Sequence, residues 1–260
     1  MAVFATVDSS PARIALVTGA GRGIGRAVAQ RLSAAGLPVA LTARSAEQLA
    51  ETATACPGPS LVLPADITDS DAVEKVFAAV EDQWGPVTVL VANAGAGHSA
   101  RVEKTTDEDW QRMLELNLTA PFRCIRRAIP AMRTAGYGRI VVIASTAARV
   151  GEPYIAAYAA SKHGVLGLVR SAAAELASSG ITVNAVCPGY VDTPMTELTV
   201  AAIGQKSGWT ADQARELLAG KQPIGRLIGT EEVADAVWLC VQSAAISGQG
   251  INVDGGAVQS

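Results

Sequence analysis

Short apolar runs alternate with longer amphipathic stretches along most of this chain. The short runs are almost continuously hydrophobic and rich in Val, Ile and Leu, and small or polar residues end most of them. A strand has this composition when helices cover both faces of a parallel sheet. We therefore expect strands at residues 14–19, 38–43, 60–66, 87–95, 139–145, 181–189 and 250–256.

Helical periodicity fills the stretches between these strands. Apolar residues recur every three or four positions at 23–36, 70–85 and 163–180, which predicts helices there. Strictly alternating strands and helices are typical of a doubly wound α/β sheet. We expect one Rossmann-type domain over residues 13–260, with about seven parallel strands, helices on both faces and a short tail at 1–12.

One segment, residues 190–228, departs from this rhythm. It contains no strand-like run and is predicted to form a small helical excursion after the sixth strand. Long insertions at strand ends often carry function, so we expect this segment to act as a lid over a substrate.

Composition limits the possible locations and partners. The chain has 260 residues, 49% of them hydrophobic, and a mean hydropathy of +0.26, which suits one large buried core. No run reaches the roughly 18 apolar residues that a spanning helix needs, and the N-terminus lacks the basic start of a signal peptide. We therefore expect a cytoplasmic protein without a membrane partner.

Charge and cysteine content exclude two further classes of protein. A net charge of −3 and 4% aromatic residues argue against binding along a nucleic-acid backbone. The four cysteines are scattered without CxxC spacing, and there are only two histidines. The sequence predicts reduced thiols and no metal site.

A glycine-rich loop, "TGAGRGIG", follows the first predicted strand. Gly19, Gly23 and Gly25 permit a tight turn and close approach of the backbone to a ligand, and the next helix would direct its N-terminus at a pyrophosphate. An ordinary glycine-rich turn is the alternative. Because the loop is the first strand-to-helix turn of a βαβ unit, the sequence favours dinucleotide binding.

The end of the second strand bears on the choice of dinucleotide. NAD-specific folds usually carry an acid near this point for the ribose 2′-hydroxyl, whereas arginine attracts a 2′-phosphate. Here Ala43 precedes Arg44, and Arg22 lies inside the glycine loop. Two arginines without a carboxylate favour NADP(H) over NAD(H), and two solvated surface arginines are the alternative.

Tyr158 and Lys162 are four residues apart in "AAYAASKHG". If this stretch is helical, both side chains lie on one face, and a phenol with a pKa of about 10 becomes a workable proton donor. We expect the neighbouring ammonium to lower that pKa. Ser145 ends the fifth strand, thirteen residues before the tyrosine, where its hydroxyl could hold a carbonyl oxygen.

With "NAG" at 93–95, "LELN" ending in Asn117 and "PG" at 188–189 also in order, residues 12–256 resemble the short-chain dehydrogenase/reductases. Within that family, "SKHGVLGLVRSAAAELASSGITVNAVCPGYVDTPM" looks most like the ketoreductases of fatty-acid and aromatic polyketide synthesis. One departure is "AGHSA" after "NAG", because some aromatic polyketide ketoreductases carry Pro-Gly-Gly there.

The resemblance implies a role for each matching residue. Tyr158 and Lys162 match the catalytic pair, Ser145 the residue that holds the carbonyl oxygen, and Asn117 the anchor of a water that reloads the proton. For Ser145 and Asn117, hydrogen bonding to the local backbone is the alternative, for Asn117 within a long helix. The cofactor positions implied by the glycine loop and by the family are Gly19, Arg22, Gly23, Ile24, Gly25, Arg44, Asp66, Asn93, Lys162, Pro188, Gly189, Val191 and Thr193.

These features together predict an NADPH-dependent ketoreductase. Its substrate would be a 3-oxoacyl thioester or a polyketide-like ketone, possible carriers being acyl carrier protein and coenzyme A. A dehydrogenase of a small secondary alcohol or cyclic ketone is the alternative enzyme, and a dinucleotide-sensing protein is the alternative from another class. The family resemblance also implies a homotetramer formed through long central helices and the C-terminal strand.

Three further side chains could suggest other roles. Tyr154 lies four residues before Tyr158 rather than before a lysine, so we expect it to border the substrate cleft or to pack ordinarily. His98 and His163 are expected to be satisfied or solvated rather than to act as general acids.

An acid-free basic stretch, "FRCIRRAIPAMRTAGYGR", supports one hypothesis about the carrier. Arg133 and its neighbours could attract the phosphate of a phosphopantetheine arm or an acidic carrier protein. A solvated or subunit-facing helix is the alternative. The arginines of this stretch are Arg123, Arg126, Arg127, Arg133 and Arg139.

Overall fold

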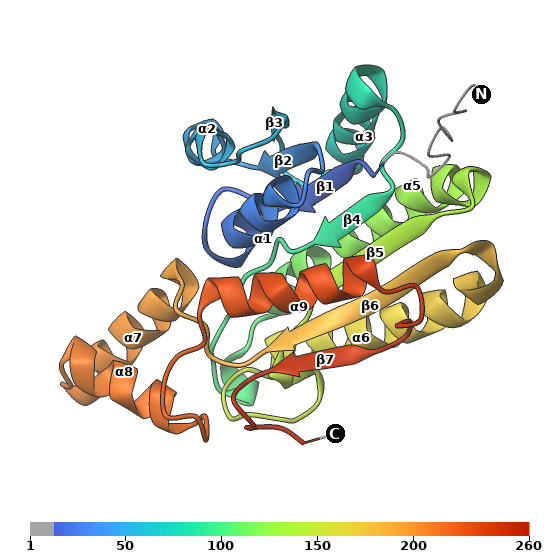
Figure 1. Ribbon diagram of the computed structural model, residues 1–260. Coiled ribbons are helices and arrows are strands. Elements are labelled where there is room, and N and C mark those ends of the chain that lie inside the picture. The colour runs from blue at the N-terminus through green and yellow to red at the C-terminus, as the bar shows by residue number, and fades with distance from the viewer. Residues whose placement is uncertain (1–12, 260) are drawn as a thin grey trace, which may run out of the picture.

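A computed structural model describes residues 13–259 and shows one seven-stranded, fully parallel sheet (Figure 1). The strand order is β3-β2-β1-β4-β5-β6-β7, so the predicted fold class is confirmed. All seven predicted strands are present but shorter than expected, most of all β4, which covers four of the nine residues predicted at 87–95. They are β1 Ala15–Thr18, β2 Val39–Ala43, β3 Ser60–Pro64, β4 Val89–Ala92, β5 Gly138–Ile143, β6 Ile181–Pro188 and β7 Gly250–Val253. The tail predicted at 1–12 lies outside the described residues.

Helices cover both faces of the sheet and form two hydrophobic cores with it (Figure 1). On one face lie α1 Gly23–Ala34, α2 Ala46–Thr54 and α9 Thr230–Gln242. On the other lie α3 Ser70–Trp84, α5 Ala120–Ala135 and α6 Ala156–Leu176. Helix α4, Asp107–Leu114, precedes α5.

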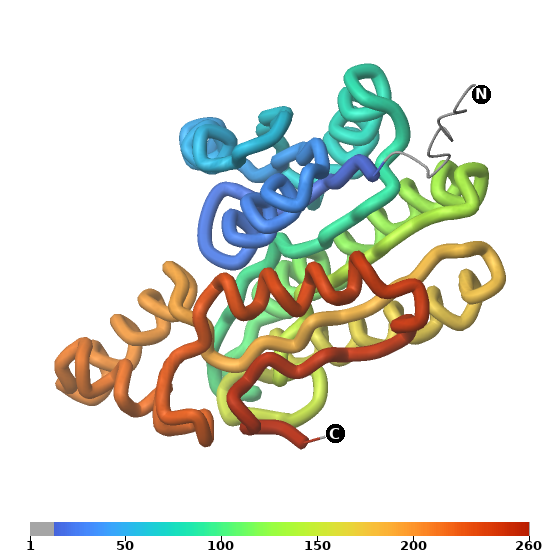
Figure 2. Tube along the Cα trace, in the orientation of Figure 1, coloured from blue at the N-terminus to red at the C-terminus, as the bar shows by residue number. Residues whose placement is uncertain are grey.

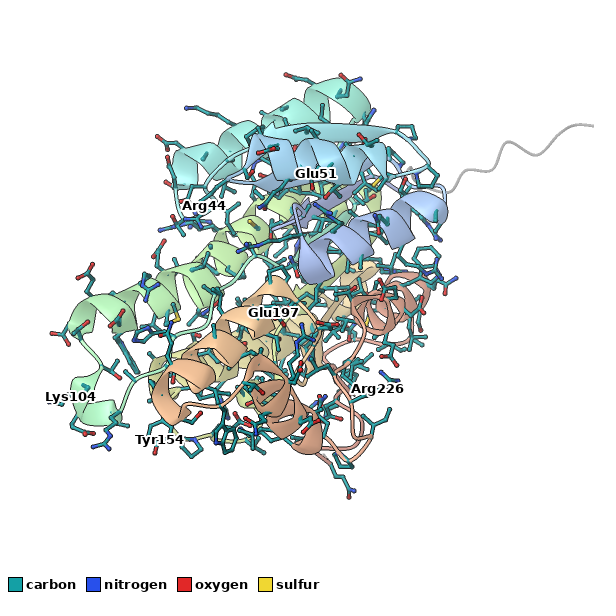
Figure 3. The ribbon with its side chains drawn as sticks, turned by 90° about the vertical axis from the view of Figure 1, so that its left-hand side faces the viewer. Arg44, Glu51, Lys104, Tyr154, Glu197 and Arg226 are labelled. Atoms are coloured by element: carbon teal, nitrogen blue, oxygen red, sulfur yellow. The ribbon has the colours of Figure 1, made fainter. Side chains whose placement is uncertain are left out.

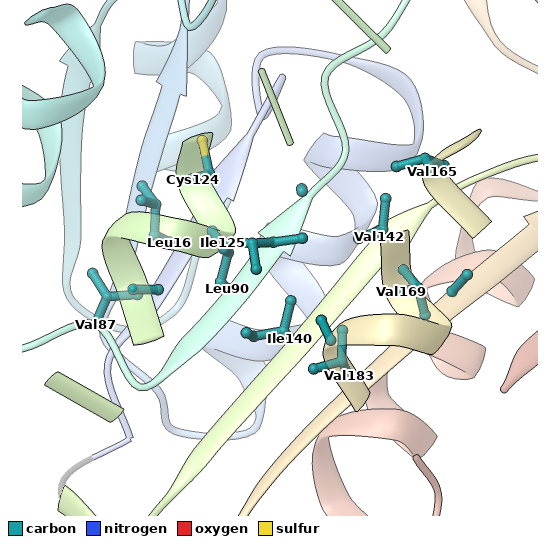
Figure 4. Close-up of a cluster of buried hydrophobic side chains, with 14 of the residues drawn as sticks. Leu16, Val87, Leu90, Cys124, Ile125, Ile140, Val142, Val165, Val169 and Val183 are labelled. Atoms are coloured by element: carbon teal, nitrogen blue, oxygen red, sulfur yellow. The ribbon is translucent and has the colours of Figure 1, made fainter. Parts of the chain in front are cut away.

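The core beneath α5 and α6 is built from one side of neighbouring strands. Figure 4 shows Leu90, Ile140 and Val183 from β4, β5 and β6 facing Ile125 of α5 and Val169 of α6, all of them buried. Burial of each such side chain contributes about 1.5–3 kcal/mol. The continuous apolar runs of the sequence are therefore explained, because their alternate residues enter opposite cores.

Local signals fix the ends of α3. The Asp69 side chain caps its N-terminus by accepting hydrogen bonds from the backbone N–H groups of Asp71 and Ala72, at 2.8 and 3.4 Å. Gly85 ends the helix at φ +104°, where a side chain would be strained.

Helix α6 starts at residue 156, before the predicted start at 163. Its first turns carry small alanine residues at 156, 157, 159 and 160, of which the one at 157 is buried. As a result, Tyr158 and Lys162 belong to one continuous helix.

The order of the strands reverses between β1 and β4. The chain runs outward from β1 to β3 and then returns to place β4 on the other side of β1. Open α/β sheets bind ligands outside the carboxyl ends of the strands at such a point.

Two helices, α7 Pro194–Ser207 and α8 Ala211–Gly220, lie between β6 and α9 in the chain. Figure 2 traces this excursion, which we call the α7–α8 arm, beyond the edge where the strands end. It has a small hydrophobic cluster of its own around Val200, Ala214 and Leu218.

Among residues 13–259, no helix has both the length and the apolar composition needed to cross a bilayer. The four cysteines are free thiols, and three of them are buried.

Candidate active site

A cleft of about 700 Å³ lies at the carboxyl ends of the strands. Three of the four predicted catalytic residues, Ser145, Tyr158 and Lys162, line it. Asn117, the fourth, lies buried behind the cleft wall. Every predicted cofactor position also lines it: Gly19, Arg22, Gly23, Ile24, Gly25, Arg44, Asp66, Asn93, Lys162, Pro188, Gly189, Val191 and Thr193.

The glycine loop leaves no room for side chains at two of its positions. A Cβ on Gly25 would lie 2.2 Å from the carbonyl oxygen of Gly19, and Gly19 itself adopts φ +65°. Helix α1 begins at Gly23 without a side-chain cap, so its first N–H groups are left for a ligand. This cradle fits a pyrophosphate and not merely a turn.

Thr18, which the sequence analysis missed, joins the glycine loop to the end of β4. Its hydroxyl accepts hydrogen bonds from the backbone N–H groups of Asn93 and Ala94, both at 3.0 Å. In return, Asn93 Nδ2 donates to the Thr18 carbonyl at 2.8 Å. In the sequence, the only sign of this role was a threonine directly before the first glycine of the loop.

Arg26 was also missed, although it supports the same loop from α1. Its Nη2 donates to the Gly21 carbonyl at 2.8 Å and to Glu51 Oε2 at 2.7 Å, and its Nε donates to Thr52 Oγ1 at 3.1 Å. An arginine one turn inside the helix was the only signal in the sequence.

At the outer end of the cleft, Arg22 and Arg44 lie on the wall next to Asp66. Neither guanidinium forms a hydrogen bond or an ion pair with another residue of the 13–259 range, and Figure 3 shows Arg44 at the surface. Asp66 Oδ1 accepts from the Thr68 N–H at 3.0 Å and from its hydroxyl at 2.8 Å. These bonds lower the pKa of Asp66, and the charge of Arg44 lowers it further.

At the inner end, α6 and the end of β5 bring Tyr158, Lys162 and Ser145 together. Lys162 Nζ donates to the Ile143 carbonyl at 2.8 Å and lies 5.7 Å from the centre of the Tyr158 ring. The Ser145 hydroxyl accepts from the Ala147 N–H at 3.1 Å and lies close enough to the Tyr158 hydroxyl to have a lowering effect on its pKa. The hydrogen bond from the Ala147 N–H matches the backbone alternative for Ser145, and its role toward a carbonyl oxygen stays a prediction.

Burial dominates the electrostatics of this catalytic pair. It raises the pKa of Tyr158, although the Ser145 hydroxyl acts in the opposite direction. Burial also lowers the pKa of Lys162 to about 8. The pKa of Tyr158 is raised rather than lowered as expected, because burial is the largest cause of its shift; Lys162 Nζ is directed at the Ile143 carbonyl.

Asn117 lies in a π-helical turn, Glu115–Thr119, between α4 and α5 rather than in one long regular helix. Its amide exchanges two hydrogen bonds with the Ala96 backbone: Nδ2 donates to the carbonyl at 3.0 Å, and Oδ1 accepts from the N–H at 3.1 Å. π-helical turns are frequent at functional sites, where they redirect single side chains. Asn117 thus fixes the loop beside Lys162, whose Nζ is 3.6 Å from the point where a Gly95 Cβ would lie.

A family model described as short chain dehydrogenase matches residues 13–203. The chain belongs to this family. It is 38% identical to D-beta-hydroxybutyrate dehydrogenase of Rhizobium meliloti, over 94% of this chain and 98% of the relative. It is 40% identical to 3-oxoacyl-(acyl-carrier-protein) reductase MabA of Mycobacterium tuberculosis, over 98% of each.

Solved structures give the same assignment. A tryptophan variant of actinorhodin polyketide ketoreductase with NADPH matches at a TM-score of 0.91 and 38% identity, over 95% of this chain and 97% of that one. Levodione reductase matches at a TM-score of 0.89 and 30% identity, over 94% of this chain and 96% of that one. The chain is therefore an oxidoreductase of a family that binds a nicotinamide dinucleotide.

In this short-chain dehydrogenase, Gln222 is another supporting residue that the sequence did not reveal. Its buried amide lies directly behind Gly189, where a Cβ would be 2.3 Å from Gln222 Oε1. It follows α8 and is thirty-three residues further along the chain, so only the fold brings the two together.

The three side chains considered for other roles lie off the cleft wall. Tyr154 is 59% exposed and adopts φ +71°, and its carbonyl accepts a hydrogen bond from the Ala100 N–H at 2.8 Å. His98 Nε2 is 3.2 Å from Asp109 Oδ2, and His163 Nδ1 is 2.9 Å from the Ala159 carbonyl. Both histidines have local partners, as expected.

The structure does not support carrier binding by the basic stretch. Arg133 lies near the C-terminus of α5, at the edge where the strands begin, away from the cleft. It pairs with Glu175 at 3.0 Å, while Arg127 pairs with Glu74 and Glu81, each at 2.7 Å. Arg139 is buried in β5 and donates to two carbonyl oxygens. Local partners already take up most of this positive charge.

Proposed function

We propose that this short-chain dehydrogenase reduces the ketone of a 3-oxoacyl thioester with NADPH. The observation that carries the proposal is the layout of one cleft. Two arginines without hydrogen-bond or ion-pair partners in the described chain lie at its outer end, and Tyr158, Ser145 and Lys162 lie at its inner end. The similarity to a ketoreductase solved with NADPH and to a 3-oxoacyl reductase supports the same conclusion.

The cleft residues suit NADPH from end to end. The glycine cradle and the N-terminus of α1 would hold the pyrophosphate, and Arg22 and Arg44 would pair with the 2′-phosphate. Pro188, Gly189, Val191 and Thr193 would form the floor for the carboxamide. When bound, the nicotinamide supplies the hydride for the carbonyl carbon.

The chain's own residues supply the proton. Ser145 would hold the carbonyl oxygen while the Tyr158 hydroxyl gives its proton to that oxygen as it becomes an alkoxide. The phenol, whose pKa is raised above its ordinary value of about 10, is protonated at neutral pH, as a proton donor must be. The charge of Lys162 would stabilise the phenolate that remains, and Asn117 would hold a water that returns the proton through Lys162.

Charges at the inner end favour an acyl group without a carboxylate beside the reacting ketone over a free acid. Of the cationic residues that line the cleft, Arg22 and Arg44 lie at the outer end, and Lys162 is directed at a backbone carbonyl. Arg112 already donates to Asp109 at 2.8 Å. Among the described lining residues, no other cation is left beside Tyr158 for a substrate carboxylate. A thioester of acyl carrier protein or coenzyme A avoids that requirement.

Two further parts of the proposal concern the arm and the assembly. The α7–α8 arm would act as the lid over the substrate, since Met195 and Thr196 of α7 line the cleft. Helix α6 exposes Gly167, Ser171 and Ala174, small residues that suit close packing against a second copy in a homotetramer. Light scattering should give a molar mass in solution that is four times the 26.6 kDa of one chain.

Initial rates with purified protein test the function. We expect NADPH to support reduction of acetoacetyl-CoA with a kcat/KM at least tenfold above that for free acetoacetate, and also above that with NADH. Faster turnover of the free acid with NADH would favour a hydroxy-acid dehydrogenase. Tight NADPH binding without turnover of any ketone would favour a dinucleotide sensor.

A further inference from the structure

Tyr190 is the residue that follows the Pro188-Gly189 floor of the cleft, and its backbone is fixed from the far end of the α7–α8 arm. Its N–H donates to Gln222 Oε1 at 2.9 Å, and its carbonyl accepts from Gln222 Nε2 at 3.2 Å and from the Ile228 N–H at 2.9 Å. Gln222 lies just after α8 and is 2% exposed. The start and the end of the arm therefore meet at this one residue.

The Tyr190 side chain makes a second connection, to the loop that precedes α6. Its hydroxyl donates to Glu152 Oε2 at 2.9 Å and accepts from Lys221 Nζ at 3.1 Å. Lys221 Nζ also lies 5.1 Å from the centre of the Tyr190 ring and 3.9 Å from the Glu152 carboxylate. The Tyr190 phenol thus lies between the Glu152 carboxylate, from the loop before α6, which we call the catalytic loop, and the Lys221 ammonium just after α8.

Two observations indicate that this contact belongs to the substrate end of the cleft. Tyr190 directly follows Gly189, which lines the cleft, and Glu152 lies in the loop that leads into α6, the helix that carries Tyr158. The arm also exposes Met195, Leu198 and Trp209, by 45%, 68% and 45%, as a surface that an extended apolar substrate would contact. Neither Glu152 nor Lys221 lines the cleft itself, so neither would touch the cofactor.

We propose that the Tyr190 hydroxyl, held between Glu152 and Lys221, is a positioning group that fixes the α7–α8 arm against the catalytic loop and so sets affinity for long acyl substrates. Only the substrate part of this role rests on the proposed ketone reduction. The mechanical part, attachment of the arm, is independent of the reaction. Hydrogen bonds to charged groups are stronger than neutral ones, which makes this a suitable fixing point.

The substitution Tyr190→Phe isolates the hydroxyl, because the ring and the bonds from Gln222 remain. The matched control is Tyr137→Phe at the start of β5, whose hydroxyl is buried without a hydrogen-bond partner in the described chain. We expect KM for 3-oxodecanoyl-CoA to rise about tenfold in Tyr190→Phe, with kcat and the Kd for NADPH within about twofold of wild type. KM for acetoacetyl-CoA should change by less than about twofold, because this short chain ends before the arm.

A double-mutant cycle separates positioning from general damage to the fold. In the background Glu152→Ala/Lys221→Met, Tyr190→Phe should raise KM by less than about twofold further, because the hydroxyl has lost both its acceptor and its donor. Equal KM changes for the long and the short substrate, or a full tenfold effect in that background, would overturn the substrate part.

Hydrogen–deuterium exchange tests the attachment without any substrate. Backbone amides of residues 194–228 should exchange at least threefold faster in Tyr190→Phe than in wild type, while Tyr137→Phe leaves them unchanged. Unchanged exchange of the arm in Tyr190→Phe would overturn the attachment. If wild type reduced no ketone, the proposed function would fail, and the exchange result would still decide whether Tyr190 fixes the arm.

Discussion

The two ends of the cleft are built by different means. At the cofactor end the backbone itself forms the site, and a single methyl group on Gly25 would collide with the Gly19 carbonyl. At the substrate end the α7–α8 arm is attached by side chains, chiefly Tyr190 and Gln222, and leaves Leu198 68% exposed. A site made of backbone tolerates almost no change, whereas one attached by side chains can be altered one contact at a time.

In the proposed function, the chemistry takes place where these two ends meet. Tyr158 and Lys162 are presented by a rigid helix, while the loop just before that helix carries Glu152 to the arm. We therefore expect the effect of a substitution to depend on its place in the cleft. Substitutions at the cofactor end should weaken cofactor binding, those at the substrate end should change substrate preference, and those where the two ends meet should abolish turnover.

The largest expected effect is at this junction. Tyr158→Phe should lower kcat by about 1,000-fold or more, because the proton donor is lost while the shape of the ring is kept. The Kd for NADPH, measured by fluorescence titration, should stay within about twofold. Activity within a few-fold of wild type would show that another group delivers the proton.

A methyl group tests the rigidity of the cofactor end. Gly25→Ala should weaken NADPH binding by about 100-fold, since its Cβ would require the loop to move away from its 2.2 Å approach to the Gly19 carbonyl. Gly97→Ala is the matched control, because a Cβ there meets nothing within 4 Å. If both variants bound NADPH like wild type, the contrast between the two ends would be lost.

Charge at the outer end should select the cofactor. Arg44→Asp should shift the ratio of kcat/KM for NADPH over NADH by about 30-fold toward NADH, because a carboxylate repels the 2′-phosphate and accepts from a 2′-hydroxyl. Lys104→Asp makes a comparable change of charge at a residue that does not line the cleft and that Figure 3 shows well apart from Arg44, and it should leave the ratio unchanged. If the ratio of kcat/KM for NADPH over NADH were unchanged in Arg44→Asp, Arg44 would be a solvated surface residue that does not contact the cofactor.

The smallest effect is on stability and follows from the buried lysine. The folded-state pKa of Lys162 is lowered from 10.5 to about 8, so the unfolded chain binds more protons between these values and wild-type stability should rise with pH there. Relative to Lys162→Met, wild type should gain about 2 kcal/mol of unfolding free energy between pH 7 and pH 9.5, measured by urea denaturation. A difference that stays constant across this range would mean that the ammonium is not desolvated.

Hydrophobic patterning was sufficient to predict the sheet. Each strand is an apolar run because it is buried on both faces, and Asp69 and Gly85 mark the ends of α3 through local hydrogen bonding and backbone conformation. The residues on the cleft wall were predictable for the same reason, since motifs at strand ends converge on one edge of a parallel sheet.

Contacts between distant segments were not predictable. Gln222 reaches Tyr190 only through the return of the arm, and the residues around Asn117 carry no sequence signal that distinguishes a π-helical turn from a regular helix. The predicted direction of the Tyr158 pKa shift was wrong for a related reason, because burial, the largest cause of the shift, is a property of the whole fold.

The most direct test of the account follows a labelled atom. NADPH carrying deuterium at the transferable position of C4 would be incubated with acetoacetyl-CoA and the wild-type protein, and the 3-hydroxyacyl product analysed by mass spectrometry. We predict one deuterium at C3 of the product with wild type, and almost no product with Tyr158→Phe. Consumption of NADPH without deuterium at C3, or the same labelled yield from both proteins, would contradict the claim that this cleft reduces a ketone with Tyr158 as its proton donor.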